Sequence, residues 1–191
     1  MLLSRRFDQR AILMQRLGRW GVHSPVEGQE AAVVGSCLAL DPARDWIVPQ
    51  YRELPAYIRQ GHTRERIVAA QMRRPVEGRI PDGVKLLPVQ VALAAQLPQA
   101  VGLGWGLRRQ GQDAVVLVYF GDGASSEGDF HEACNLAGVV RAPVVFRFQN
   151  NGWAISTPRR LQSAAASLAS RATGYGFTGM VVDGHDLLAV H

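Results

Sequence analysis

The sequence predicts an α/β fold in which a parallel sheet is flanked by helices. The main observation is AVVLVYF at residues 114–120, a run of apolar and β-branched residues that is typical of a buried strand. A helical pattern follows over residues 125–140, and a second apolar stretch, APVVFRFQNN, occupies residues 142–151. A strand, a helix and a strand in this order predict a parallel pair joined by a right-handed crossover.

The first 88 residues alternate between helical patterns and stretches rich in proline and glycine. Apolar side chains recur at helical spacing over residues 3–20, and the small-residue-rich segment 28–40 predicts a second helix. Residues 41–53 hold two prolines and are predicted to form a loop. Residues 54–74 again have a helical pattern, whereas 73–88 are predicted to be irregular.

Two further elements complete the predicted fold. Residues 92–111 have a helical pattern that contains Gly102, Gly104 and Gly106. Each glycine costs a helix about 1 kcal/mol relative to alanine, so this helix predicts a close approach to another helix. Its spacing is not the GxGxxG of a dinucleotide-binding fold. The segment GMVVDG, residues 179–184, predicts a third strand.

Composition and charge limit the function classes. Of the 191 residues 47% are hydrophobic, which is enough for a core. The net charge is +5, but the arginines are scattered, so a solvated basic surface is a better interpretation than a nucleic-acid site. The sequence contains no apolar stretch of about 18 residues, and no membrane span is expected. Cys37 and Cys134 are expected to be buried free thiols in a reducing cytoplasm.

Polar residues follow both strands of the predicted parallel pair. Gly121-Asp122-Gly123 ends the first strand and Asn150-Asn151-Gly152 ends the second. Ligands bind beyond the carboxyl ends of strands in open parallel sheets. A carboxylate and an amide oxygen suit Mg²⁺, and glycines before a helix N-terminus suit a phosphate. The two ends together predict a magnesium–diphosphate cradle; Asp122 as a plain turn residue is the alternative.

The pair of motifs is similar to the signature of thiamine diphosphate enzymes, with 29 residues from Asp122 to Asn151 (151 minus 122). GDGASSEGDFHEACNLAGVVRAPVVFRFQNNGWAISTP resembles the alpha subunit of the decarboxylating component of 2-oxo acid dehydrogenase complexes. Further motifs match in the same order, namely GQEA at 28–31, YRE at 51–53, IPDGV at 80–84, AAQLPQAVG at 94–102 and VDGHDLLAV at 182–190. IPDGVKLLP together with FQNN is most similar to the bacterial pyruvate dehydrogenase branch.

The resemblance implies a cofactor site built from several parts of the chain. Magnesium would be coordinated by the side chains of Asp122 and Asn151 and by the backbone carbonyl of Trp153. The thiamine diphosphate would be held by the backbone of Gly123 and Ala124, by Tyr51 and Arg52 on its other side, by Leu93 under its bend, and by a turn that Gln149 helps to shape.

The resemblance also implies the organisation of the protein. Residues 1–191 would form one thiamine diphosphate-binding alpha domain, with helices and loops in 1–88 and the cofactor-binding core in 89–191. Its expected partners are a beta subunit, in an α2β2 tetramer, and the lipoyl-bearing acyltransferase of the complex. We expect a small-molecule 2-oxo acid as substrate, no binding to nucleic acid or membrane, and a cytoplasmic location.

The expected reaction is oxidative decarboxylation of pyruvate, with transfer of the acyl group to lipoamide. A branched-chain 2-oxo acid dehydrogenase or an acetoin dehydrogenase alpha chain is one alternative. Another is a truncated, non-catalytic remnant that binds a beta-like partner, since the family pattern continues beyond residue 191. No catalytic residue is assigned to this chain, because the resemblance places one activating glutamate on the beta subunit and a histidine loop beyond residue 191.

Overall fold

The central sheet contains three parallel strands in the order β1-β2-β3. The structure, a computed structural model, describes residues 1–74 and 76–191. The strands are β1 (Trp46–Val48), β2 (Val116–Gly121) and β3 (Val144–Gln149). Val116 pairs with Val144 and Gly121 with Gln149, and β1 pairs in parallel with β2 over three residues. The α/β class and the parallel pair are therefore confirmed.

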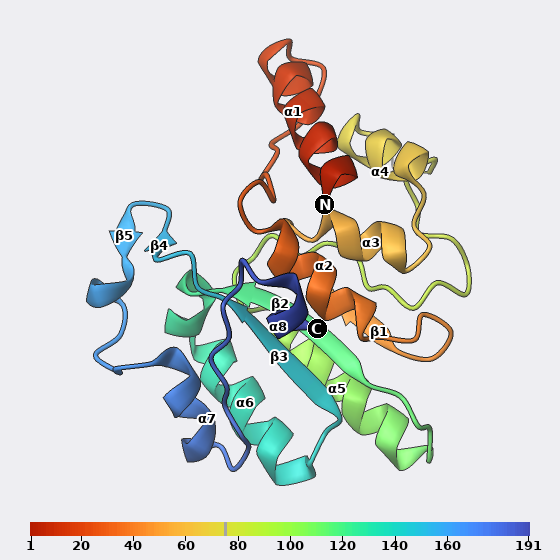
Figure 1. Cartoon of the computed structure of the whole chain (residues 1–191). Coiled ribbons are helices and arrows are strands. Elements are labelled where there is room, and N and C mark those ends of the chain that lie inside the picture. The colour runs from red at the N-terminus through yellow and green to blue at the C-terminus, as the bar shows by residue number, and fades with distance from the viewer. Residues whose placement is uncertain (75) are drawn as a thin grey trace.

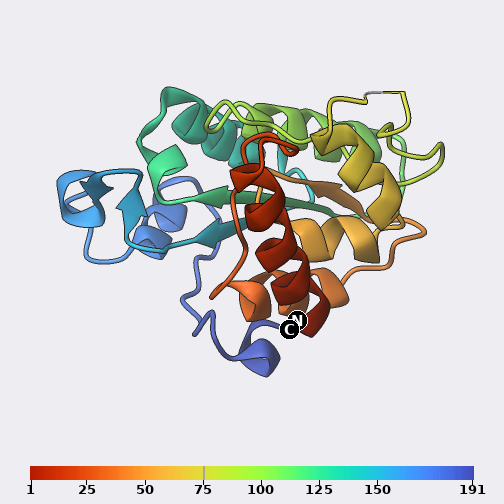
Figure 2. The ribbon, with the colours of Figure 1, turned by 90° about the horizontal axis from the view of Figure 1, so that it is seen from above.

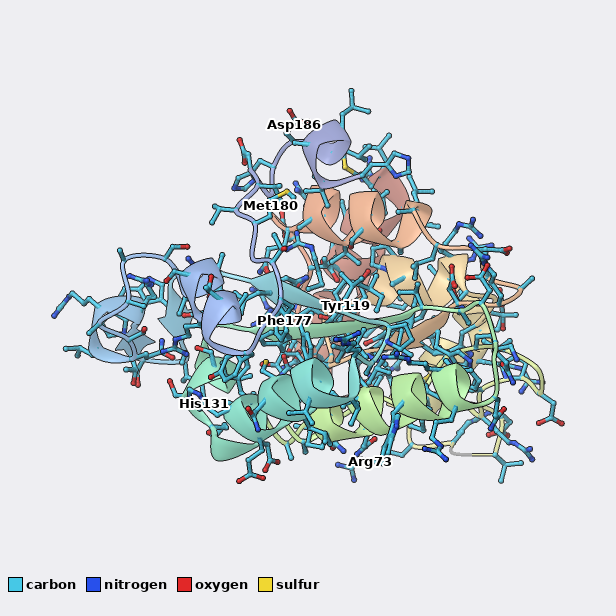
Figure 3. All side chains as sticks on the ribbon, turned by 90° about the horizontal axis from the view of Figure 1, so that it is seen from below. Arg73, Tyr119, His131, Phe177, Met180 and Asp186 are labelled. Atoms are coloured by element: carbon cyan, nitrogen blue, oxygen red, sulfur yellow. The ribbon has the colours of Figure 1, made fainter. Side chains whose placement is uncertain are left out.

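Helices cover both faces of this sheet, so the molecule has three layers (Figures 1 and 2). Val116, Val118 and Phe120 of β2 pack among residues of α5 (Gln96–Arg109) and α6 (Gly128–Val140). Leu117 and Tyr119 point to the opposite face and pack among residues of α2 (Glu30–Leu38) and α3 (Leu54–Arg59). Because both faces are covered, β2 is an uninterrupted apolar run, as buried parallel strands are. Tyr119 (Figure 3) also shares a hydrogen bond of 2.9 Å between its hydroxyl and Oγ of Ser36 in α2.

Strand β1 lies inside residues 41–53, which the sequence predicted to be a loop, and that prediction is wrong over Trp46–Val48. Three residues are too few to show the period of a strand, and the flanking prolines hide it. A further segment extends the sheet beyond β1. The amide of Ile47 donates to the carbonyl of Lys85 at 2.9 Å, and the amide of Leu87 donates to the carbonyl of Ile47 at 3.0 Å.

The first 74 residues form helices α1 (Leu2–Arg16), α2 (Glu30–Leu38), α3 (Leu54–Arg59) and α4 (Arg64–Gln71). The predicted helices at 3–20 and 28–40 are confirmed within a few residues of their ends. The single helix predicted over 54–74 is wrong, because Gly61 with φ +105° ends α3 and the Thr63 hydroxyl caps α4. Pro75, in the stretch 73–88 predicted to be irregular, lies outside the described residues.

Helices α5 (Gln96–Arg109) and α6 (Gly128–Val140) form the second helical layer, and a short 3₁₀ helix, η1 (Gly123–Ser126), precedes α6. The predicted contact of the α5 glycines with another helix is wrong. A Cβ built on Gly104 would lie 2.8 Å from Cγ2 of Val144, at the start of β3. Within the described part of the chain, a Cβ on Gly102 or Gly106 would meet no atom within 4 Å.

The last 40 residues form short elements only. A two-stranded hairpin, β4 (Trp153–Ala154) and β5 (Thr157–Pro158), is followed by 3₁₀ turns η2 (Arg159–Leu161) and η3 (Leu168–Ser170) and by helices α7 (Arg171–Gly174) and α8 (Leu187–Val190). The third strand predicted over 179–184 is wrong: this segment is irregular, and α8 after it packs on α2 (Figure 3). Met180 and Val181 are therefore exposed instead of paired with β3.

Both cysteines are buried free thiols, as predicted. Burial raises the pKa of Cys37 to about 11 and that of Cys134 to about 12, which makes both thiols poor nucleophiles. In residues 1–74 and 76–191 we find no helix that is long and apolar enough to span a membrane.

The two glycines on α5 provide a matched test of this packing. Gly102→Ala should raise the free energy of unfolding by up to about 1 kcal/mol, because alanine favours the helix and the added methyl group has space. Gly104→Ala should be less stable than Gly102→Ala by about 1–3 kcal/mol, because its methyl group would press on Val144, Pro143 and Ala142. Urea unfolding of both variants measures the difference, and equal stabilities would contradict the described approach of α5 to β3.

Candidate functional site

The carboxyl ends of the strands meet at one edge of the sheet, because β1, β2 and β3 are parallel. Residues 49–53 follow β1, residues 122–126 follow β2 and residues 150–153 follow β3. The segment that runs beside β1 reaches the same edge, since the amide of Gln90 donates to the carbonyl of Gln50 at 3.2 Å. Leu93 lies three residues after Gln90. This edge is the place where an open parallel sheet binds its ligand.

Asp122 is a buried acidic residue at this edge and is only 1% exposed. Its Oδ2 accepts a hydrogen bond from Nε2 of Gln162 at 3.2 Å. Its Oδ1 is buried and has no hydrogen-bond partner among the described residues. A buried carboxylate oxygen without a partner is costly, so it requires a donor or a cation. The carbonyl of Asp122 is also fixed, because Oγ of Ser125 donates to it at 2.8 Å.

Gly123 begins η1 and leaves room for a close approach to the backbone. A Cβ on this residue would lie 2.8 Å from Cβ of Ala154 in β4 and 3.8 Å from Cδ1 of Leu93. The structure thus brings Gly123 and Leu93 together from segments 30 residues apart in sequence (123 minus 93). The next residue, Ala124, is 1% exposed. A side chain larger than hydrogen at position 123 would press on Ala154 and move β4 away from this turn.

The end of β3 lies beside the end of β2. Gln149 pairs with Gly121 and is buried, and its Nε2 has no hydrogen-bond partner in the described part of the chain. Asn151 is exposed, and its Oδ1 accepts a hydrogen bond from the amide of Trp153 at 3.1 Å. This turn positions the β4–β5 hairpin, in which the Trp153 side chain is 58% exposed. The asparagine oxygen keeps a second lone pair for another donor or a cation.

Tyr51 and Arg52 follow β1 and are half-buried. Nη1 of Arg52 donates to the carbonyl of Pro25 at 2.8 Å, and the guanidinium lies 5.5 Å from the centre of the Tyr51 ring. Among the residues that the structure describes, no carboxylate lies within 4 Å of this guanidinium. Arg52 therefore carries a positive charge without a counterion at the edge where an anion would bind.

Glu53 supports the backbone of Tyr51 and Arg52 through hydrogen bonds. It is 2% exposed, and its Oε2 accepts hydrogen bonds of 3.0 Å from the amides of Gln50 and Arg52. The Tyr57 hydroxyl lies 3.4 Å from the same oxygen. Burial raises the pKa of Glu53 to about 7, although the backbone hydrogen bonds act against this rise. The backbone around Tyr51 is thus fixed by a carboxyl group that changes its charge near neutral pH.

Sequence reasoning missed Gln162, Ser125 and Arg171. Gln162 contacts Asp122 as described, and Arg171 donates to the carbonyl of Ser125 at 2.9 Å and to Oγ of Ser163 at 2.7 Å. These hydrogen bonds hold the segment between η2 and α7 against residues 121–126. Gln162 and Arg171 lie in a stretch with no strand or helix period, so the sequence carried no signal for them. Ser125 belongs to the GDGASSEGDF motif, but only the structure shows that it is buried and that its hydroxyl supports the turn through the carbonyl of Asp122.

The residues at this edge fit a magnesium ion with a diphosphate. The partnerless Oδ1 of Asp122 is a hard oxygen donor, which suits a magnesium ion. Gly123 lies in the turn before α6, and backbone amides near a helix N-terminus suit a phosphate. Within residues 1–74 and 76–191 no group of three or more His, Cys, Asp or Glu side chains could hold a metal. A magnesium ion that takes most of its oxygens from phosphate and water needs no such group.

Asp122, Gly123, Ala124, Leu93 and Gln149 are thus joined by contacts or by register at one edge. Asn151 follows Gln149 by two residues, and its amide oxygen is engaged with Trp153. Tyr51 and Arg52 are placed at this edge by the direction of β1, while the hydrogen bond of Arg52 runs to Pro25. For both of these residues the structure gives the position, and their contact with a ligand stays a prediction.

Comparison with known proteins gives three findings. The family model of the dehydrogenase E1 component matches residues 1–191. The chain is 41% identical over its full length to the pyruvate dehydrogenase E1 component subunit alpha of Staphylococcus epidermidis and to that of Staphylococcus aureus. It spans about half (51%) of the length of these curated relatives. A solved structure from Mycobacterium smegmatis, described as a thiamin diphosphate-dependent enzyme, matches 77% of this chain and 25% of its own, with TM-score 0.50 and 19% identity.

The raised pKa of Glu53 predicts that the free energy of unfolding depends on pH. A carboxyl group with a folded-state pKa of about 7, against 4.5 unperturbed, binds its proton more tightly in the folded chain. The free energy of unfolding should therefore fall as pH rises from 4.5 to 7, by about 3 kcal/mol at most. Glu53→Gln should remove this pH-dependent part of the free energy of unfolding. Glu132→Gln, at an exposed position, should keep the pH dependence of the wild type. Urea unfolding between pH 5 and 8 provides the comparison, and parallel profiles for wild type and Glu53→Gln would show that Glu53 does not titrate in this window.

Proposed function

The chain belongs to the dehydrogenase E1 component family, and from this premise we propose that it is the alpha chain of a thiamine diphosphate-dependent pyruvate dehydrogenase component. The observation that carries the proposal is Asp122, a buried carboxylate with a partnerless oxygen at the carboxyl edge of a parallel sheet. The proposed reaction is oxidative decarboxylation of pyruvate with transfer of the acyl group to lipoamide.

In this proposal Asp122 and Asn151 hold magnesium through their side-chain oxygens, and Trp153 does so through its carbonyl. Gly123 and Ala124 meet the diphosphate through backbone amides, and Tyr51 and Arg52 meet it from the side of β1. Arginine suits this role because its planar fork can hold two phosphate oxygens. Gln149 supports the turn between the two halves of the site.

Thiamine diphosphate, when bound, supplies a nucleophilic carbon and an electron sink for the loss of carbon dioxide. The residues of this chain bind and orient it. Leu93, beside Gly123, offers an apolar support for the bend of the cofactor. Asp122 offsets the positive charge of the metal, and Arg52 offsets the negative charge of the phosphates. No residue of this chain is proposed as a proton-transfer group.

The choice of pyruvate and of partners is supported by the relatives, which are named as pyruvate dehydrogenase E1 alpha subunits. We propose a beta subunit as the partner that completes the cofactor site in an α2β2 tetramer, and a lipoyl-bearing acyltransferase as the acceptor of the acyl group. The free buried thiols of Cys37 and Cys134 suit a reducing cytoplasm, where we place the protein.

Substitution of the metal ligand tests the proposed site. Asp122→Ala should weaken magnesium-dependent binding of thiamine diphosphate by at least tenfold, or about 1.4 kcal/mol, because the ion would lose its only charged protein ligand. Isothermal titration of the chain together with its beta subunit measures this affinity. Asp129→Ala, which removes an exposed carboxylate in the first turn of α6, is the matched control. Unchanged affinity in Asp122→Ala would remove the assignment of this site.

Activity tests the proposed reaction. With a beta subunit, magnesium and thiamine diphosphate, pyruvate should reduce an artificial electron acceptor with a higher kcat/KM than branched-chain 2-oxo acids or acetoin. Residues 1–191 without a partner should give no measurable turnover, because a general acid–base group contributes about 10²–10⁴-fold and the family pattern places such groups elsewhere. A preference for a branched-chain acid would favour the alternative alpha chain, and turnover by residues 1–191 alone would contradict the proposed division of the site.

A further inference from the structure

We propose that Asp8 in α1 is a positioning residue that orients the Arg52 guanidinium through the peptide group between Pro25 and Val26. The inference rests on the proposed function, in which Arg52 binds the diphosphate of the cofactor. It adds a residue of the first helix to the machinery of a site that lies at the sheet edge. Three observations carry it: the hydrogen bonds of Asp8, the hydrogen bond of Arg52, and the peptide that joins them.

Asp8 is a buried carboxylate that is saturated with donors. Its side chain is 1% exposed. Its Oδ2 accepts hydrogen bonds from the amides of Val26 at 2.7 Å and Glu27 at 2.8 Å, and its Oδ1 lies 2.9 Å from Nε2 of His23. Hydrogen bonds to an ionised acceptor are stronger than neutral ones. Three of them from residues 23–27 fix the conformation of this loop relative to α1.

Arg52 is attached to the same loop on its other side. Its Nη1 donates to the carbonyl of Pro25 at 2.8 Å, and this is the one protein hydrogen bond of its guanidinium within the described residues. The carbonyl of Pro25 and the amide of Val26 belong to one peptide group. A trans peptide is planar, and its C=O and N–H point in opposite directions. The Asp8 carboxylate therefore holds one end of this peptide and the Arg52 guanidinium holds the other.

This arrangement has two consequences for Arg52. A peptide whose N–H donates to a carboxylate is a better acceptor at its C=O, because hydrogen bonds in a chain polarise one another. The carbonyl also cannot turn away without breaking a charged and buried hydrogen bond. Arg52 is thus held at one nitrogen, while its other donors stay available for an anion.

A small cavity next to this series of hydrogen bonds supports the same interpretation. Asp8, His23, Tyr51 and Arg52 all line one small cavity of about 30 Å³, together with residues of α1, α3 and α4. Asp8 and the two residues proposed to bind phosphate therefore belong to one continuous piece of the structure. A role for Asp8 limited to packing of α1 would not require its hydrogen bond to run through the peptide that holds Arg52.

A double-mutant cycle tests whether Asp8 acts through Arg52. The full chain with its beta subunit is titrated with thiamine diphosphate and magnesium in the variants Asp8→Asn, Arg52→Gln and both together. We expect Arg52→Gln to weaken the affinity by about tenfold or more and Asp8→Asn by about three- to tenfold, because a neutral amide oxygen binds the Val26 amide more weakly than a carboxylate does. The double variant should bind no more weakly than Arg52→Gln alone, since residues that act as one unit are not additive.

Further variants keep the test decisive. Asp113→Asn, at an exposed carboxylate paired with Arg44, is the matched control and should bind as wild type does. His23→Gln removes one support of Asp8 at a less buried position and should weaken the affinity about two- to threefold, again only when Arg52 is present. This variant gives the answer if Asp8→Asn does not fold, and the unfolding midpoint of every variant is measured alongside.

The outcomes separate the inference from the proposed function. Weaker binding in Asp8→Asn that disappears in the Arg52→Gln background supports the positioning role. Wild-type affinity in folded Asp8→Asn, or an equal loss with and without Arg52, overturns it while leaving the cofactor site in place. Arg52→Gln with wild-type affinity would instead overturn the proposed role of Arg52 in cofactor binding, and the inference with it.

Discussion

Because β1, β2 and β3 run parallel, their carboxyl ends meet at one edge, and the candidate site depends on this constraint. Each strand ends on a different polar segment, and the common direction of the strands brings these segments to one edge. The edge also leaves backbone amides and carbonyls without ladder partners. The chain satisfies some of them with turns, as at Asp122 and Asn151.

Three buried carboxyl groups then determine how this edge is held. Oδ2 of Asp8 and Oε2 of Glu53 each accept hydrogen bonds from two backbone amides, and they support the loop at 23–27 and the backbone of Tyr51 and Arg52. Asp122 has one oxygen bonded to Gln162 and one without a partner. A buried carboxylate is costly unless it is fully bonded. Of these three carboxyl groups, Asp122 alone has an oxygen that is both fully buried and without a partner among the described residues, which is why we propose it as the ligand-binding one.

Much of the fold followed from local pattern. The apolar run before Asp122, the helix after it and the second strand were predictable because each has a clear period and enough length. The placement of Asp122 and Asn151 after the ends of two adjacent strands followed from the direction of parallel strands. Elements without a period were not predictable: β1 has three residues, and the break at Gly61 depends on a positive φ. The apolar residues of 179–184 have the composition of a strand, but composition alone does not provide a pairing partner.

The sequence by itself determined the α/β class, the βαβ unit and the motifs from which we propose a magnesium–diphosphate cradle, because these are encoded in short stretches. Only the tertiary structure decided what supports the proposed cradle. Asp8 reaches the Pro25–Val26 peptide and Gln162 reaches Asp122 across 40 residues, and a hydrogen bond between distant segments leaves no period in the sequence. The protonation of Glu53 is likewise a tertiary property, because its pKa is raised by the burial that the whole fold creates.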